Sequence, residues 1–152
     1  MTLDLFNDRG DNGGNKLRTY RTFKTGIYDE RYLNLVKDKY MRINICKLRI
    51  SAHNLPIEIG RHHRPCKIPV EMRKCELCKL DCIGDEFHLI MQCDKFSIQR
   101  HMFMEKLRLQ TPSFDNMNIS EKFITIMRMD NDTLIINFNT FLRNILMIRG
   151  EL

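Results

Sequence analysis

The sequence predicts a mainly α-helical fold, a small helical domain with a cysteine-rich hairpin or turn inserted between its helices. Three observations support this prediction. Apolar residues recur at steps of three and four along several segments, which is the period of one face of an α-helix. Four cysteines and a histidine fall within nineteen residues, CELCKLDCIGDEFHLIMQC, and the alternation typical of strands is scarce. A chain of 152 residues is long enough for one such domain with a single core.

Composition divides the chain into a lead-in and one domain. Residues 7–16, NDRGDNGGNK, are rich in Gly, Asn and Asp and have almost no apolar side chains, so residues 1–15 are expected to form a flexible N-terminal lead-in. Residues 16–152 are expected to form a single helical domain. Within it, residues 16–74 make a basic helical segment, residues 75–93 hold the cysteine-rich motif, and residues 94–149 form C-terminal helices.

The first long helix is predicted to begin at Asp29, a residue type suited to the N-cap. Its apolar positions recur at helical steps and are Leu33, Val36, Tyr40, Ile43, Cys46 and Ile50. Lys39, Arg42 and Arg49 fall on a neighbouring stripe of the same helix. Packing of the apolar face should therefore leave a basic edge exposed.

A basic strap is expected to follow this helix. Pro56 and Gly60 should end regular structure, and the stretch GRHHRPCKIPVEMRK has two prolines and no helical period. Its cationic residues are Arg61, Arg64, Lys67, Arg73 and Lys74. Residues 16–74 hold 15 Lys and Arg against 5 Asp and Glu, within a chain of net charge +6. This excess predicts a basic face for a polyanion, and an ordinary solvated surface is the alternative.

Three helices are predicted after the cysteine-rich motif. The first is capped by Asp94, and its periodic positions are Phe96, Arg100, Phe103 and Leu107. The second opens at Asn118, with Glu121 three residues further on, which is the spacing of a capping box. The last begins near Asp132 and ends at Gly150, and its wide apolar face is formed by Leu134, Phe138, Phe141, Leu142, Ile145 and Ile148.

The spacing of Cys75, Cys78, His88 and Cys93 is that of a zinc site. A Cys-x2-Cys turn lets two thiolates approach one ion while backbone amides donate to the sulfurs, and KCELCKL is the best candidate for a short hairpin. The run GDEFHLIMQC is predicted to be helical from about Asp85, so that a ligand on the helix and one at its end can reach the same metal. Three thiolates and an imidazole close a tetrahedral shell. We therefore expect one structural Zn²⁺ and no metal catalysis.

Three alternatives compete with this assignment. Cys82 lies between the two pairs and competes as a ligand, although zinc ligands usually form two separated pairs. A disulfide such as Cys78 to Cys93 requires an oxidising compartment, and buried thiols without metal are the plainest interpretation. The sequence shows no export signal and no apolar run of membrane length. An intracellular protein, nuclear or cytoplasmic and not secreted, is therefore expected, with reduced thiols.

The runs KLRTYRTFK, KLRISAHNLPIEIGRHHR, PVEMRKCELC and DEFHLIMQC together resemble a known family. They are similar to the C-terminal end of the reverse-transcriptase polyproteins of animal non-LTR retrotransposons, where a basic helical segment, an H-x-L-x-I-E-x-G-R turn and a Cys-Cys-His-Cys zinc motif follow the polymerase domain. The resemblance runs from about Lys16 through the helix after Cys93. It implies that the zinc ligands are Cys75, Cys78, His88 and Cys93, and that the turn is formed by His53, Leu55, Ile57, Glu58, Gly60 and Arg61.

The resemblance also implies that this region grips RNA or target DNA during target-primed reverse transcription. Arginine and lysine gain affinity for phosphates by releasing counterions, and the expected contacts are Lys39, Arg42, Arg49, Arg61, Arg64, Lys67, Arg73 and Lys74. The Asp pair of a polymerase and the motif of a restriction-type nuclease are missing, so no enzymatic activity is expected. A reverse-transcriptase domain is the other expected partner, with no membrane and no small-molecule substrate. The alternative is a structural or protein-interaction fragment, a detached retrotransposon remnant, in which zinc only closes the fold.

Overall fold

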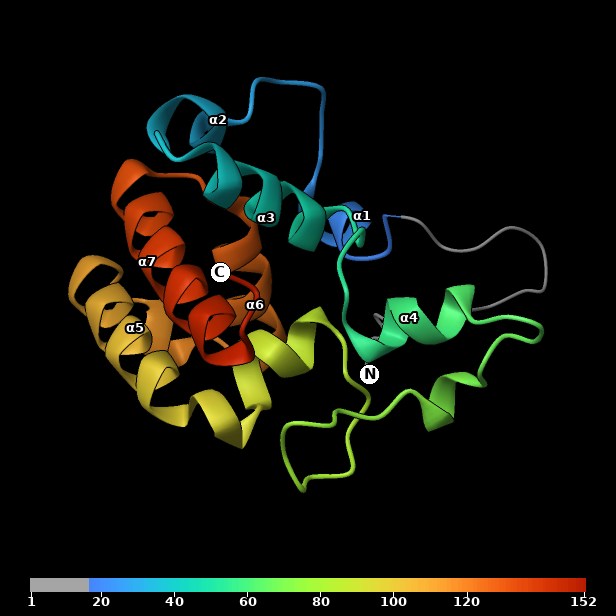
Figure 1. Ribbon diagram of the computed structural model, residues 1–152. Coiled ribbons are helices and arrows are strands. Elements are labelled where there is room, and N and C mark those ends of the chain that lie inside the picture. Colours follow the sequence, from blue (N-terminus) through green and yellow to red (C-terminus); the bar gives the residue numbers. More distant parts are fainter. Residues whose placement is uncertain (1–16) are drawn as a thin grey trace.

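The structure, a computed structural model, describes residues 17–152, which fold into helices joined by loops (Figure 1). The first half contains α1 (Tyr20–Phe23), α2 (Arg31–Leu35), α3 (Lys39–Arg49) and α4 (Pro56–His62), and the second half contains α5 (Ser97–Gln110), α6 (Ile119–Arg128) and α7 (Asp132–Arg149). Short 3-10 helices span Val70–Met72, Asp94–Phe96 and Phe114–Asn116, and a π-helix spans His88–Gln92. The predicted mainly helical fold is confirmed, whereas the predicted lead-in, residues 1–15, lies outside the described residues.

Helix α7 is the centre of the packing. It contacts α2, α3 and α5, and it runs between them in Figure 1. The ring of Phe103 in α5 stacks on that of Phe141 in α7, with 4.8 Å between the ring centroids. The helix begins where the side chain of Asn131 accepts a hydrogen bond from the backbone amide of Leu134, and it ends at Gly150, whose φ is 72°. Both predicted ends are therefore confirmed. None of the helices within residues 17–152 is long and apolar enough to cross a membrane.

The two other predicted C-terminal helices are present, and one of their caps is wrong. At the start of α6, Asn118 and Glu121 form the predicted capping box, each side chain bonding the backbone amide of the other residue. Asp94 does not cap α5, because a 3-10 helix, Asp94–Phe96, follows Cys93 and delays the start of α5 to Ser97. The sequence pattern placed this helix correctly but put its N-cap two residues too early, at Asp94 in place of Phe96.

The long helix predicted from Asp29 to Ile50 is wrong in its continuity, because it is two helices. The backbone is extended at Val36 and Asp38. The side chain of Asp38 accepts hydrogen bonds from the backbone amides of Tyr40 and Met41, which caps α3 as a new helix. Nη1 of Arg42 donates to the carbonyl oxygens of Val36 and Lys37, at 2.7 and 2.8 Å, and these hydrogen bonds stabilise the loop between the two helices.

The prediction that Pro56 ends regular structure is also wrong, because Pro56 opens α4. Proline suits the first turn of a helix, where its missing amide hydrogen has no helical partner. The basic strap is therefore shorter than predicted. Helix α4 continues to His62, and the strap is interrupted by the 3-10 helix Val70–Met72.

Candidate metal centre

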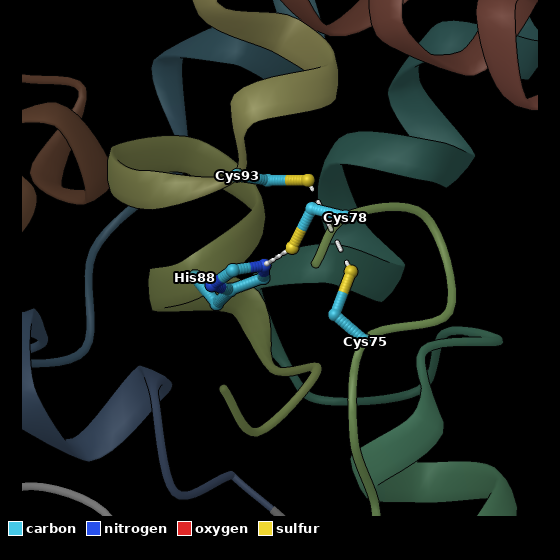
Figure 2. Close-up of side chains that lie close together, drawn as sticks. All are labelled: Cys75, Cys78, His88 and Cys93. Carbon is cyan, nitrogen blue, oxygen red and sulfur yellow. Dashed lines mark hydrogen bonds between the residues drawn. The ribbon is translucent and has the colours of Figure 1, made fainter. Parts of the chain in front are cut away.

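The side chains of Cys75, Cys78, His88 and Cys93 converge on one point (Figure 2). Their ligand atoms all lie within 4.8 Å of one another. The Sγ atoms of Cys75 and Cys93 are 3.9 Å apart, and Sγ of Cys78 is 3.2 Å from Nε2 of His88. Zinc–sulfur bonds of about 2.3 Å in a tetrahedron place two sulfurs about 3.8 Å apart. The four predicted ligands can therefore hold one metal ion.

A hairpin-like turn presents the first two cysteines. Its ends are joined by one antiparallel bridge between Lys74 and Ile83. The amide of Cys75 donates to the carbonyl of Cys82 at 2.9 Å, and the amide of Gly84 donates to the carbonyl of Arg73 at 2.9 Å. The predicted hairpin is thus present, but a single bridge takes the place of two paired strands. The loop that this bridge closes carries both Cys75 and Cys78.

The other two ligands lie on a helical segment whose last turn is wide. The amide of Cys93 donates to the carbonyl of His88 at 2.8 Å, which is a hydrogen bond across five residues. Such a π-helical turn closes one revolution between positions 88 and 93, whereas an α-helical turn of 3.6 residues would leave them on different sides. The predicted helical start at Asp85 is confirmed, because Oδ1 of Asp85 accepts a hydrogen bond from the amide of His88.

Without a bound cation, the Cys93 thiol and the His88 imidazole both favour their neutral forms. Burial raises the pKa of the Cys93 thiol to about 12, and the neighbouring thiols of Cys75 and Cys78 add to this effect. Burial also lowers the pKa of the His88 imidazole, which favours the neutral ring with its free lone pair. Three thiolates this close repel one another, and a bound divalent cation removes that repulsion. The chemistry of the donor set therefore fits a metal ion.

The remaining cysteines do not join this cluster. Cys82 donates its thiol hydrogen to the carbonyl of Leu80 at 3.3 Å and is not one of the grouped ligands. Cys46 packs partly buried against the core, as predicted, and Cys66 is exposed. All six cysteines are free thiols, so the alternative disulfide between Cys78 and Cys93 is absent.

A network of buried charges includes Glu86 on the segment that carries the ligand His88. Nη2 of Arg18 donates to both carboxylate oxygens of Glu86 at 2.9 Å, and Nη1 of Arg18 donates to Glu58. The ring of His53 is 2.7 Å from the same Glu86 carboxylate. Burial alone would favour the protonated acid, but the hydrogen bond and charge of His53 and the charge of Arg18 hold the pKa of Glu86 at about 2. Glu86 is therefore a carboxylate anchored two residues before the ligand His88.

The segment from His53 to Arg61, which the resemblance implied to be a turn, is a short loop followed by helix α4, and Ile57, Glu58, Gly60 and Arg61 all lie in that helix. Nδ1 of His53 accepts a hydrogen bond from the amide of Leu55 at 3.2 Å, just before α4 begins. Gly60 leaves room for the side chain of Arg73, because a Cβ atom at Gly60 would lie 2.6 Å from Cγ of Arg73. Helix α4 therefore packs closely against the segment that leads into Cys75.

Arg49 was expected on the exposed basic edge of its helix, and that prediction is wrong. The residue is only 2% exposed. Its Nη1 atom is 2.6 Å from Oε2 of Glu30, and its guanidinium carbon lies 4.6 Å from the ring centroid of Phe23 and 5.1 Å from that of Tyr32. The cation is paired and stacked inside the core, so it is not available to a polyanion.

Arg61 and Arg73 were also expected to face a polyanion, and they too are buried. Nη2 of Arg61 is 3.1 Å from Oε2 of Glu58. The side chain of Arg73 donates from Nε to the carbonyl of Ile68 at 2.8 Å and from Nη1 to the carbonyl of Ile57 at 3.1 Å. Arg61 is thus paired with a carboxylate of its own helix, and Arg73 bonds the backbone of the strap and α4, so both predictions of surface contact are wrong.

The other predicted nucleic-acid contacts lie nearer to solvent. Lys39, Arg64 and Lys67 are exposed. Arg42 is half-buried over the break between α2 and α3, and Lys74 is half-buried with Nζ 2.9 Å from the carbonyl oxygen of Asp81. The structure therefore separates the basic residues into buried structural cations and a smaller exposed set.

The buried partners Arg18 and Glu86 were not identified from the sequence. They are 68 positions apart, so no local spacing connects them. Glu58 and Arg61 are different, because they lie three positions apart on one helix, and this spacing in the sequence is typical of an ion pair. No family model, no curated protein and no solved structure matches this chain.

Proposed function

We propose that this chain is a zinc-stabilised nucleic-acid-binding module, similar to the C-terminal end of the reverse-transcriptase polyproteins of animal non-LTR retrotransposons. The observation that carries the proposal is the cluster of Cys75, Cys78, His88 and Cys93, at the end of a strap with exposed cations. Three thiolates and one imidazole are soft donors that suit Zn²⁺, and four protein ligands complete its tetrahedral shell. The zinc ion in this proposal is structural.

The cations proposed to contact phosphate are the exposed ones. Arg64 and Lys67 lie between α4 and the 3-10 helix Val70–Met72, and within residues 17–152 neither has a carboxylate within 4.0 Å. Lys74 is not counted among them, because it is half-buried and its Nζ is 3.4 Å from Oδ2 of Asp81, whereas exposed Lys39 adds a contact from α3. The metal-held turn fixes the end of the strap, so that these charges are presented without a loss of chain entropy on binding.

The proposed binding is dominated by phosphate contacts and depends steeply on salt. Lysine and arginine side chains that replace condensed counterions need no particular base sequence. Buried Arg49, Arg61 and Arg73 support the proposal only indirectly, because their contacts lie within the fold. A reverse-transcriptase or nuclease step has no place in it, and the chain acts by binding alone.

The decisive experiment compares two charge-matched pairs of substitutions in the zinc-loaded chain. Arg64→Ser with Lys67→Ser removes two strap cations, and Lys106→Ser with Arg128→Ser removes two exposed cations from α5 and α6. Affinities for a short RNA and a short DNA duplex are measured at several salt concentrations. The strap pair should weaken binding about tenfold and reduce the slope of log K against log salt by about 2, while the control pair changes little. Equal losses in both pairs, or no loss in the strap pair, would reject the proposal.

A second candidate function is docking of a protein segment, for which a reverse-transcriptase domain is the proposed partner. It is favoured by a cavity of about 180 Å³ beside the metal centre. Ile59, Met72 and Leu77 line it and are exposed. Exposed apolar side chains grouped around a cavity are typical of interaction sites. One bound zinc ion without salt-sensitive binding to RNA or duplex would favour this second function.

A further inference from the structure

A larger hollow lies away from the strap, beside the segment that carries His88 and Cys93. It has a volume of about 430 Å³, and its walls come from α5, the first turn of α6, the 3-10 helix Phe114–Asn116 and Met91 of the π-helix His88–Gln92. Helix α5 lies on the opposite side of the molecule from α4 in Figure 1. None of the residues that line this hollow belongs to the strap, residues 60–74. Its size falls within the range of about 300–1,000 Å³ that is usual for small-ligand sites.

The polar lining of the hollow is cationic. Arg100, His101, Arg108 and Lys122 contribute to it, and among residues 17–152 no Asp or Glu side chain does. Arg108 already pairs with carboxylates at the rim. Lys122 has no carboxylate within 4.0 Å in the described part of the chain. The guanidinium of Arg100 donates from Nη2 to the carbonyl of Cys93 at 3.0 Å, and its Nη1 is buried without a hydrogen-bond partner. A buried guanidinium nitrogen without an acceptor is unfavourable, so these groups favour an anionic occupant.

The remaining lining is apolar and flexible. Met91, Met104, Phe114 and Ile119 form it, and the ammonium group of Lys122 lies 5.4 Å from the centroid of the Phe114 ring. Methionine side chains adapt their shape to a flat or irregular group and contact aromatic rings favourably. A small inorganic anion would leave this apolar surface uncovered. The hollow therefore suits a ligand that combines an anionic group with an apolar body.

We propose that this hollow binds a phosphate ester with a flat apolar body, as in one nucleotide. Several cations around one space suit the charge of a phosphate better than that of a single carboxylate. The nucleotide has two sources, a free mononucleotide or an unpaired nucleotide of a single strand, and for the second source the inference rests on the proposed function. A paired nucleotide keeps its base inside the stack, so a duplex cannot place the base in the hollow without flipping it out.

The test uses the zinc-loaded full chain and two charge reversals. Lys122→Glu lies in the hollow, and Lys106→Glu changes the net charge equally at an exposed position of α5 that does not line it. Calorimetric titrations compare adenosine monophosphate, inorganic phosphate, an oligothymidylate and a duplex of equal length. Lys122→Glu should weaken the binding of adenosine monophosphate or of the oligothymidylate at least tenfold, and Lys106→Glu should change it less than twofold. Circular dichroism and zinc content check that both variants are folded.

The outcomes separate the two sources of the nucleotide. Binding of adenosine monophosphate that depends on Lys122 identifies a free nucleotide, and dependence seen only with the oligothymidylate identifies a single strand. In either case inorganic phosphate should bind at least tenfold more weakly than the ligand with a base. Equal losses in both variants, equal affinity for inorganic phosphate, an equal effect on the duplex, or no binding of either nucleotide ligand would each overturn the inference.

Failure of this inference can be distinguished from failure of the proposed function. Nucleic-acid binding that depends on Arg64 and Lys67 but not on Lys122 would keep the proposed function and remove the nucleotide site. Binding of adenosine monophosphate that depends on Lys122, with no strap-dependent binding of RNA or duplex, would do the reverse.

Discussion

Nη2 of Arg18 donates hydrogen bonds to both carboxylate oxygens of Glu86, at 2.9 Å each. Glu86 is fully buried and lies two residues before the metal ligand His88. The same carboxylate is 2.7 Å from Nε2 of His53, in the loop before α4. Three segments that are far apart in the sequence therefore meet at one carboxylate on the segment that carries a metal ligand. Removing this charge should disturb the fold and the metal centre together.

The substitution Glu86→Gln is expected to lower the free energy of unfolding by about 3–5 kcal/mol, because it leaves Arg18 buried with one partner fewer. The amide keeps the shape of the side chain, so the change reports on charge rather than on packing. Urea unfolding of the zinc-loaded chain, followed by circular dichroism, measures the effect. We also expect weaker zinc binding, because the segment that carries His88 loses its anchor.

Glu105→Gln is the matched control for this substitution. Glu105 pairs with Arg108 on α5, where both side chains are about half exposed. Its removal should change the free energy of unfolding by less than about 1 kcal/mol. If the two variants are equally stable, the Arg18–Glu86 pair does not connect these segments energetically.

Cys75→Ser should abolish stoichiometric metal binding, whereas Cys82→Ser should leave one metal ion per chain. Cys75 is one of the four grouped ligands, and Cys82 is not, although the two residues are joined by a backbone hydrogen bond. Metal content after dialysis measures both variants. Chelation of the wild-type chain should produce the same loss of ordered structure as Cys75→Ser, because the free energy of metal binding contributes to folding.

Full metal content in the Cys75→Ser variant would remove Cys75 from the ligand set. Loss of metal from Cys82→Ser would restore the alternative in which Cys82 binds the ion. The two serine substitutions are equal in size and polarity, so a difference between them reports on the position of the thiol.

Local patterns were enough to predict the helices of the second half and the ligands. The capping box of Asn118 and Glu121 and the end of α7 at Gly150 depend on residues that are close in the sequence. The four ligands lie within nineteen residues, and their spacing is itself the signal. These features could be predicted because each is decided by a short stretch of backbone.

Local patterns could not predict which basic residues are buried and which are exposed. Arg49 and Arg73 have the same local character as exposed Arg64 and Lys67, and only tertiary contacts bury them. The break between α2 and α3 was missed for a similar reason. The periodic apolar positions favour one continuous helix, but the side chain of Asp38 caps a new helix in the middle of them. Composition predicted the positive charge of the segment correctly, but it could not say which cations hold the fold.

Arg49→Lys should destabilise the chain by about 2 kcal/mol although it keeps the positive charge. The planar guanidinium group of Arg49 lies over the rings of Phe23 and Tyr32 and pairs with Glu30, and an ammonium group cannot reproduce this stacking. Thermal or urea unfolding measures the loss. Nucleic-acid affinity of the folded variant should be unchanged, because the side chain is buried.

Lys39→Arg, the opposite exchange at an exposed position of the same helix, provides the comparison. It should alter stability by no more than about 0.5 kcal/mol. A loss of nucleic-acid binding in folded Arg49→Lys would contradict the assignment of Arg49 to the core.

Gly84→Ala should destabilise the chain by about 3 kcal/mol and weaken metal binding. A Cβ atom at Gly84 would lie 2.6 Å from Cγ of Pro56, and the rigid proline ring at the start of α4 cannot move aside as a flexible side chain would. Gly84 also accepts a hydrogen bond from the amide of Ile57 and donates one to the carbonyl of Arg73, so a shift of its backbone would open the turn that carries Cys75.

Gly26→Ala is the matched control, because its nearest atoms, in Tyr28, lie 3.6 Å away, and it should be neutral or slightly stabilising. Urea unfolding and competition with a chelator measure both variants. Equal stability of the two would show that the contact between Gly84 and Pro56 does not restrain the metal-holding turn.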